Sequence, residues 1–399
     1  MKRVFFFLCV LSCLCCGCDR DERLARDRQA VLVYIAGDNS LSDEGKNDYA
    51  ALKEAWLPAT RGSEKVVLVF HHFTGEAPVL VRLSKDRKGN VVEDIIREYA
   101  YTTNSAQAQT LRTVIADAEA VWPSVHHGLV LWSHGSGFLP PGYYTDPQER
   151  RVSDPALLAP DPYADLVKAE GAGVKSFAVD DALEMDLLEL RDALSRFHYD
   201  FIAFDCCLMA NVELAYELRN NCDYLLFSPT EILVDGFPYE MMMQAIFSQQ
   251  TEAAMRSIAQ AYMANYRAYT GVYCSATISL VSTAALPALA AACQTIFRNH
   301  RAQTLMVDRS KVQAYFRFNK HWFYDIDDFV GQLSGDSEYQ AFNRALNQAV
   351  VFRDATDYFL DLEISHYSGL SIYIPRSEYT VLNNYYRSLA WNEATGLVQ

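Results

Sequence analysis

The chain has 399 residues, with 35 Lys and Arg against 50 Asp and Glu, and a formal net charge of −15. Half of the residues are hydrophobic and 21% are charged, a globular composition that excludes wholesale disorder. The acidic balance, with no basic tract, argues against nucleic acid as a partner. Of the 10 cysteines, half lie in the first 18 residues, so they do not form a disulfide framework spread along the chain.

The N-terminus has the layout of an export signal. Lys2 and Arg3 precede an apolar run from Val4 to Cys16, which is too short to span a bilayer comfortably. The run ends in Gly17-Cys18 and is followed by acidic residues. This ending resembles a bacterial lipoprotein signal, in which cleavage leaves a cysteine that is acylated.

The lipoprotein interpretation predicts a signal peptide over 1–17, lipidation of Cys18 and a lipidated tether over 18–29. Cys16 is a second candidate for the lipid, and a simple cleaved signal or an N-terminal anchor is the alternative. We therefore expect the protein in the bacterial cell envelope, anchored by lipid at the outer membrane or cell surface, or secreted.

Buried-strand and helix patterns then alternate along the chain. Continuous apolar runs are typical of strands buried on both faces of a parallel sheet, and they occur at 31–36, 66–70, 128–132, 201–204 and 224–227. Helical spacing lies between them, at 43–56, 110–122, 187–197 and 211–219. The alternation predicts an α/β fold with a mostly parallel sheet flanked by helices.

The pattern changes from about residue 246. Helical spacing covers 252–269 and 286–298, and strand-like runs cover 273–282 and 370–374. No linker-like segment precedes this part. We therefore predict a main domain over 30–245 and a closely packed α+β C-terminal subdomain over 246–399.

A histidine and a cysteine each follow one of the predicted strands. Ligand sites in such sheets lie beyond the carboxyl ends of the strands, where His134 and Cys207 would meet. A nucleophilic cysteine needs an imidazole and donors for the oxyanion, and Gly135 could expose an amide. We also expect Cys207 to open a helix whose positive end lowers the pKa of the thiol. On composition alone, the alternative is a Cys and a His with no joint role.

Several motifs together resemble the clostripain family of cysteine peptidases, which belongs to the caspase-like clan. The His and Cys motifs are LWSHGSG at 131–137 and FDCCLMANVE at 204–213. Further matching segments bring the resemblance to roughly 30–390, and they lie at 34–41, 177–181, 190–194, 228–231, 236–239 and 369–375.

The resemblance implies a caspase-like fold and a cysteine endopeptidase that hydrolyses peptide bonds after Arg or Lys. Cys207 would be the nucleophile and His134 the general acid and base, with the amides of Gly135 and Cys207 as the oxyanion site. The family usually has Asp-Ala-Cys where this chain has Asp-Cys-Cys, so Cys206 is the alternative nucleophile. A disulfide between the two neighbours would block catalysis.

Specificity and processing residues also follow from the resemblance. It places Asp235 at the base of the specificity pocket, where the alternative is a solvated turn carboxylate. Asp205, two residues before Cys207, would orient the active site or help bind substrate, and the alternative is a strand-end cap. The family is activated by internal cleavage after a basic residue between the His and the Cys. In the long loop over 140–176 the candidates, with the two arginines favoured, are Arg150, Arg151, Lys168 and Lys175.

We expect no required cofactor and no metal site. Asp325 to Asp328 could contact calcium, which some family members use, but an acidic turn or helix start is the alternative. The expected partners are protein or peptide substrates, with the membrane reached through the lipid. One competing function is a catalytically silent surface lipoprotein that binds protein or glycan. Another is a serine hydrolase using 134–137 as an oxyanion loop, against which the missing nucleophile elbow counts.

Overall fold

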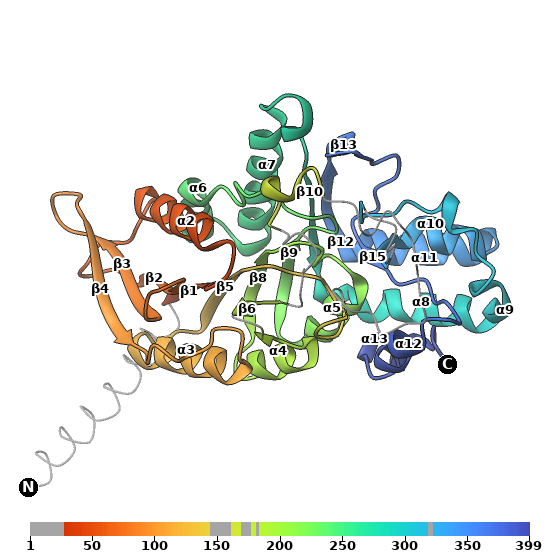
Figure 1. The fold of residues 1–399 in the computed structure, drawn as a ribbon, viewed down its shortest axis with the longest axis horizontal. Coiled ribbons are helices and arrows are strands. Elements are labelled where there is room, and N and C mark those ends of the chain that lie inside the picture. Colours follow the sequence, from red (N-terminus) through yellow and green to blue (C-terminus); the bar gives the residue numbers. More distant parts are fainter. Residues whose placement is uncertain (1–27, 144–160, 169–176, 181–182, 318–321) are drawn as a thin grey trace, which may run out of the picture.

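A nine-stranded sheet forms the centre of the protein (Figure 1). The computed structural model describes residues 28–143, 161–168, 177–180, 183–317 and 322–399. The strand order is β12-β10-β9-β8-β5-β1-β2-β3-β4. The strand bounds are β1 Gln29–Gly37, β2 Lys65–Phe73, β3 Val79–Lys85, β4 Val91–Glu98, β5 His126–Trp132, β8 Tyr199–Asp205, β9 Cys222–Phe227, β10 Thr277–Ser282 and β12 Val350–Ala355.

The five central strands, from β9 to β2, run parallel, and the two strands at each edge join antiparallel. Apolar runs form these strands because both of their faces are covered: residues 31–37 of β1 are all buried. The predicted α/β class with a mostly parallel sheet is confirmed.

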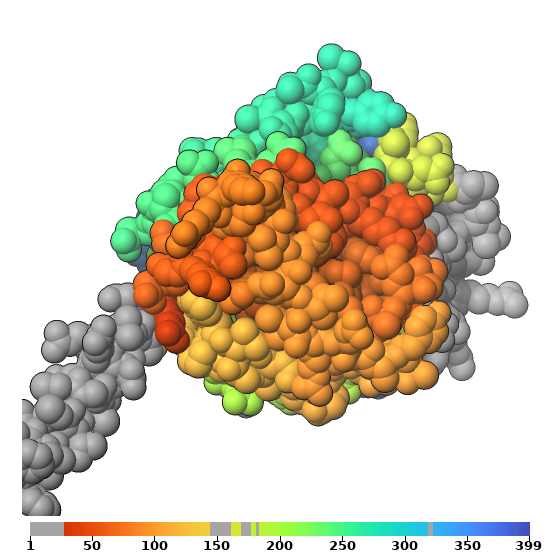
Figure 2. Space-filling view, turned by 90° about the vertical axis from the view of Figure 1, so that its left-hand side faces the viewer, coloured from red at the N-terminus to blue at the C-terminus, as the bar shows by residue number. Residues whose placement is uncertain are grey.

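Helices cover both faces of the sheet (Figure 1). One face carries α3 (Ala108–Val121), α4 (Leu187–Leu194) and α5 (Val212–Glu217), and the other carries α2 (Ser42–Glu54), α6 (Tyr239–Ser248) and α7 (Thr251–Arg267). Viewed from the β4 side, α2 and the strands of the first third of the chain form most of the surface (Figure 2).

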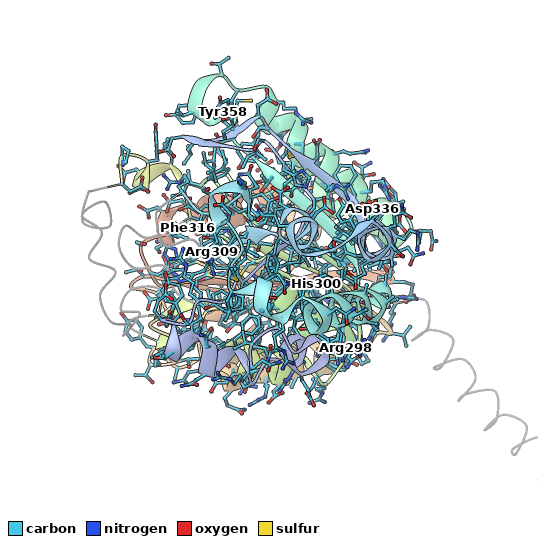
Figure 3. All side chains as sticks on the ribbon, turned by 90° about the vertical axis from the view of Figure 1, so that its right-hand side faces the viewer. Arg298, His300, Arg309, Phe316, Asp336 and Tyr358 are labelled. Carbon is cyan, nitrogen blue, oxygen red and sulfur yellow. The ribbon has the colours of Figure 1, made fainter. Side chains whose placement is uncertain are left out.

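The C-terminal part extends the same sheet. β10 pairs with β9, so the predicted division at residue 245 does not separate two sheets. The remaining helices pack beyond β12, and Figure 3 shows this side, with His300 and Asp336 on it and Tyr358 on a short hairpin. Their bounds are α8 Leu286–Asn299, α9 Arg301–Thr304, α10 Ile326–Leu333, α11 Asp336–Ala349, α12 Thr380–Tyr386 and α13 Ala390–Thr395.

Three short strand pairs complete the described part. They are β6 (Val179–Asp180) with β7 (Leu183–Glu184), β11 (Tyr324–Asp325) with β15 (Ser371–Ile372), and β13 (Tyr358–Phe359) with β14 (Leu362–Glu363). Across the described residues, no helix combines the length and the apolar character needed to cross a membrane.

One glycine in the sheet makes a testable contribution to stability. Gly128 on β5 is paired with Phe201 on β8, and a Cβ at position 128 would lie 2.4 Å from the Phe201 ring. We expect Gly128→Ala to lower the free energy of unfolding by about 1–3 kcal/mol, because the ring must move within a packed core. Denaturant unfolding in a Cys207→Ala background measures the change.

The matched control is Gly331→Ala in α10. A Cβ there meets only Tyr339, at 3.7 Å, and alanine favours a helix interior, so stability should hold or rise. Equal stability of the Gly128→Ala and Gly331→Ala variants would contradict the close approach of β5 and β8.

Candidate active site

The predicted histidine and cysteine come to the same edge of the sheet. His134 lies two residues after β5, and Cys207 lies two residues after β8. These strands are parallel neighbours, with Trp132 paired to Asp205 at their carboxyl ends. Both side chains are fully buried. The parallel pairing of β5 and β8 therefore brings His134 and Cys207 to the same edge of the sheet, as predicted from their positions after the strands.

The chain after Cys207 turns instead of starting a helix. Leu208 has a φ of 63°, a left-handed conformation that costs a non-glycine residue about 1–2 kcal/mol. Asn211 caps α5 by accepting the amide of Leu214, and the helix begins at Val212. The expectation that Cys207 opens a helix is wrong, and the helix dipole does not act on its thiol directly.

The two adjacent thiols make different contacts. The Cys206 thiol donates to the carbonyl of Leu131 on β5, at 3.3 Å. The Cys207 sulfur accepts the amide of Ile232 at 3.3 Å and faces the carbonyl of the same residue at 3.9 Å. Both cysteines are free thiols, so the structure contains no disulfide between them.

The surroundings of Cys207 keep its thiol protonated. Burial raises the pKa of the thiol well above its usual value, and the nearby carboxylate of Glu231 raises it further. A thiol with a raised pKa is a poor nucleophile at neutral pH. Burial and the Glu231 carboxylate therefore disfavour the thiolate of Cys207 in the described structure.

A glycine allows the two motifs to pack closely. A Cβ on Gly135 would lie 2.6 Å from the Cys207 carbonyl oxygen and 2.9 Å from both Cys206 Cβ and Met209 Sδ. These distances are shorter than a real Cβ tolerates, so only glycine fits directly after His134.

A segment of the chain itself pairs with the loop that contacts Cys207. Val167 forms an antiparallel bridge with Leu233. The amide of Lys168 donates to the carbonyl of Ile232 at 2.8 Å, and the amide of Val234 donates to the carbonyl of Leu166 at 3.0 Å. Residues 166–168 thus lie as a short strand along 232–234, as an extended peptide ligand does in β-augmentation.

The backbone of Lys168 contacts His134 and also Ile232, the residue that contacts the Cys207 thiol. The carbonyl oxygen of Lys168 is 2.7 Å from His134 Nδ1. On the other side, the Lys168 amide donates to Ile232, the residue whose backbone contacts the Cys207 thiol. His134 Nε2 is 3.1 Å from Ser40 Oγ, which orients the ring.

The side chain of Lys168 is buried in an acidic pocket. Its Nζ lies 2.8 Å from Asp205 Oδ2 and 3.2 Å from Asp48 Oδ2, and 4.7 Å from the ring centroid of Trp132. The side chain has no exposed surface. Burial alone would lower the pKa of Lys168, but the two carboxylates raise it, so the ammonium stays charged.

Neighbouring donors hold both carboxylates in place. Tyr239 donates its hydroxyl to Asp205 Oδ2 at 2.9 Å, and the Phe237 amide lies 3.3 Å from the same oxygen. Trp132 Nε1 donates to Asp48 Oδ2 at 2.7 Å. Burial raises the pKa of Asp48 to about 6, although Lys168 opposes this shift.

Asp235 does not line the pocket that holds Lys168. Its residue is exposed, and its carboxylate interacts with the hydroxyl of Tyr269. The neighbouring Gly236 lies against the pocket instead, because a Cβ there would be 2.5 Å from Lys168 Nζ. The acidic residues around this ammonium are Asp205 and Asp48.

A buried arginine ties the segment before Lys168 to the loop after Cys207. Arg317 lies 2.6 Å from Asp161 Oδ2 and 2.6 Å from Glu231 Oε2. Asp161 begins the described stretch that ends at Lys168, and Glu231 directly precedes Ile232. This bidentate ion pair fixes both sides of the short strand pairing.

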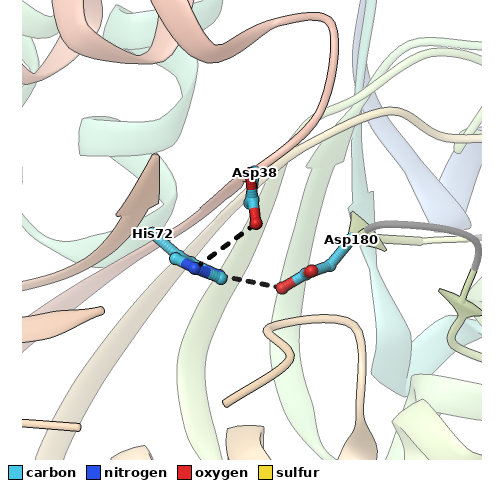
Figure 4. Close-up of side chains that lie close together, drawn as sticks. All are labelled: Asp38, His72 and Asp180. Atoms are coloured by element: carbon cyan, nitrogen blue, oxygen red, sulfur yellow. Dashed lines mark hydrogen bonds and ion pairs between the residues drawn. The ribbon is translucent and has the colours of Figure 1, made fainter. Parts of the chain in front are cut away.

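A second polar cluster lies at the ends of β1, β2 and β6 (Figure 4). His72 Nδ1 is 2.8 Å from Asp180 Oδ2, and Nε2 is 3.5 Å from Asp38 Oδ2. Burial opposes ionisation of Asp180, yet hydrogen bonds from His72 and Ser105 lower its pKa. The three side chains are close enough to hold a metal ion, although the ion pairs and the Ser105 bonds already account for their arrangement.

The acidic run considered for calcium has other partners. Asp325 caps α10 and accepts from Ser368 at 2.6 Å, and Asp327 lies 3.1 Å from His366 Nε2. The hydrogen bond with Asp327 raises the pKa of His366 to about 9. The run forms a helix start, as the alternative interpretation has it, and His366 supplies positive charge.

Four predicted residues lie outside the described part of the chain. They are Cys18, Arg150, Arg151 and Lys175.

Two features of the site were missed from sequence. Asp48 lies mid-helix, although it falls on the buried face of α2 with Gly45, Tyr49 and Leu52, and a carboxylate on an apolar helix face is a signal that could have found it. The pairing of residues 166–168 with 232–234 has no local signal.

The fold and this site define a class, the α/β cysteine peptidases. Residues 33–153 and 166–395 match the model of the clostripain family, and the chain belongs to that family. It is a cysteine peptidase. No curated protein matches the chain.

Solved structures agree with this assignment. The chain is 32% identical to an inactive zymogen C11 protease from Parabacteroides distasonis, covering 93% of this chain and 98% of that one, with a TM-score of 0.75. It is 27% identical to a secreted C11 cysteine protease from Bacteroides thetaiotaomicron, solved with an irreversible peptide inhibitor, covering 92% and 98%, with a TM-score of 0.73. A cysteine protease from B. fragilis is 29% identical over 55% of this chain and 96% of that one, with a TM-score of 0.51.

The buried thiol predicts slow alkylation of Cys207 before any cleavage of the chain. In a His134→Ala variant whose chain is verified to be intact, iodoacetamide at pH 8 should modify Cys207 at least tenfold more slowly than the half-buried Cys274. Peptide mass spectrometry follows both, with the buried Cys293 as the internal reference for a protected thiol. If Cys207 reacts as fast as Cys274, the thiol is not held in the protonated state described.

Proposed function

We propose that the protein is an endopeptidase that cleaves after basic residues with His134 and Cys207, and that its first substrate is its own bond after Lys168. The observation that supports this most strongly is the position of Lys168. Its side chain lies in a doubly acidic pocket, and its carbonyl oxygen lies 2.7 Å from His134 Nδ1. A bound substrate would present its P1 residue, the one before the cleaved bond, in this way.

The proposed reaction begins with transfer of the Cys207 thiol proton to His134. The sulfur attacks the carbonyl carbon, and the amides of Gly135 and Cys207 stabilise the oxyanion. His134 then gives its proton to the leaving amine as the peptide C–N bond breaks. A water molecule, deprotonated by His134, hydrolyses the thioester, which leaves the lysine carboxylate and returns the proton to the thiol.

Lys168 is preferred over the other processing candidates. Among the four basic residues considered in the loop, it alone is described, and it occupies the pocket. Cleavage after Lys168 would leave residues 161–168 attached through the Arg317 ion pairs and would free the segment that follows. The favoured Arg150 and Arg151 have no such support.

The identity of the nucleophile has a direct test. We expect Cys207→Ala to abolish cleavage of fluorogenic peptides ending in Lys or Arg, a loss of at least 1000-fold in kcat/KM, because no other thiol faces the 232–234 strand in the described residues. Cys206→Ala should keep activity within about tenfold, since this thiol contacts Leu131 and the family commonly has alanine there. Activity that survives Cys207→Ala, or that only Cys206→Ala removes, would overturn the assignment.

We further propose that the chain is a bacterial lipoprotein, lipidated at Cys18 and held at the cell envelope. The support is the Gly17-Cys18 ending of the apolar run. Labelled palmitate should enter the wild-type protein and not Cys18→Ala, with Cys16→Ala as the matched control. Equal labelling of the wild type and Cys18→Ala would remove Cys18 as the attachment point.

A further inference from the structure

The surroundings of Lys168 Nζ point to a specificity role for a residue outside the strand ends. We propose that Asp48 is a specificity-determining residue that makes the pocket select lysine over arginine before the cleaved bond. This inference rests on the proposed function, because it takes the pocket that holds Lys168 as the one that receives substrate side chains.

Described residues surround the Lys168 ammonium on four sides. Asp205 Oδ2 and Asp48 Oδ2 accept from Nζ at 2.8 Å and 3.2 Å. The Trp132 ring covers a third side, with its centroid 4.7 Å away. The backbone of Gly236 closes a fourth side, where even a Cβ would come within 2.5 Å of Nζ. The pocket is therefore matched to the length of a lysine side chain.

An arginine side chain has a different shape. Its guanidinium is planar, and its terminal nitrogens lie one bond farther from the backbone than the nitrogen of lysine. In this pocket those nitrogens would fall where the oxygens of Asp48 and Asp205 now lie. Both carboxylates would have to retract, although Trp132 and Tyr239 hold them by hydrogen bonds. A compact ammonium meets both carboxylates without such movement.

The two carboxylates come from different parts of the fold, so their roles can be separated. Asp205 ends β8 beside the catalytic cysteine, whereas Asp48 projects from α2. Asparagine at position 48 has the same shape and can still accept the Trp132 hydrogen bond, but it removes the negative charge opposite the ammonium. Loss of that charge should weaken the binding of a substrate lysine side chain. It should weaken the binding of an arginine side chain less, if that side chain contacts Asp205 alone.

The experiment uses the self-processed enzyme and two peptides, Leu-Val-Lys and Leu-Val-Arg, each with the same fluorogenic leaving group. We expect the wild type to prefer the lysine peptide at least tenfold in kcat/KM. Asp48→Asn should lower kcat/KM for the lysine peptide at least tenfold, mainly through KM, and for the arginine peptide less than threefold. The control is Asp43→Asn, an exposed acid on the same helix, which should leave the ratio unchanged.

Two further variants keep the proposal testable if Asp48→Asn does not process itself. Lys168→Arg should slow self-cleavage of the intact chain at least tenfold, since the internal bond then presents the disfavoured side chain. Asp235→Asn should leave the ratio of kcat/KM for the lysine and arginine peptides unchanged. The family resemblance predicts instead that this variant alters cleavage after basic residues.

Three results would overturn the role of Asp48. One is equal or faster cleavage after arginine by the wild type, as expected if a guanidinium reached Asp205 Oδ1, which has no hydrogen-bond partner in the described structure. The second is an equal loss on both peptides in Asp48→Asn, which a merely structural role would produce. The third is a Lys168→Arg chain that cleaves itself as fast as the wild type. Failure of the wild type to cut either peptide would instead reject the proposed function.

Discussion

The structure depends on the burial of one ammonium between two carboxylates. Lys168 has no exposed surface, and neither has Asp205. A buried charge is tolerated only when it is paired and hydrogen-bonded, and here Asp48, Tyr239 and Trp132 complete the network. Because this side chain is held, the backbone of Lys168 is held as well, with its carbonyl beside His134. Under the proposed function, the chain thus occupies its own active site.

The same arrangement limits the reactivity of the Cys207 thiol in the described form. The Cys207 thiol is buried next to Glu231, which favours its protonated state. Arg317 binds both Glu231 and Asp161, so one cation secures the loop that contacts the thiol and the segment that ends at Lys168. Under the proposed function, the described form is a precursor that cleaves itself once and is closed to other substrates. The solved relative from Parabacteroides distasonis is an inactive zymogen.

The parts of the site that follow strand ends could be predicted from sequence, and the parts made by tertiary pairing could not. His134 and Cys207 follow adjacent parallel strands, and that topology brings them to one edge. Asp48 and Lys168 are 120 residues apart, and no local pattern links them. The prediction that a helix begins at Cys207 was wrong. Leu208 adopts a left-handed conformation, and Asn211 caps a helix that begins at Val212. Asp235 was placed by family resemblance, and in the described structure it is exposed and interacts with Tyr269.

The central claim is that Lys168 is positioned for cleavage by its own chain, and mapping of the new chain ends tests it most directly. Purified wild-type protein would be incubated and the products sequenced from both new ends, with Lys168→Ala and Cys207→Ala as companions. The account predicts one product ending at Lys168, one beginning at Ala169, and intact chains for both variants. New ends after Arg150, Arg151 or Lys175, or the same cleavage in Cys207→Ala, would contradict it.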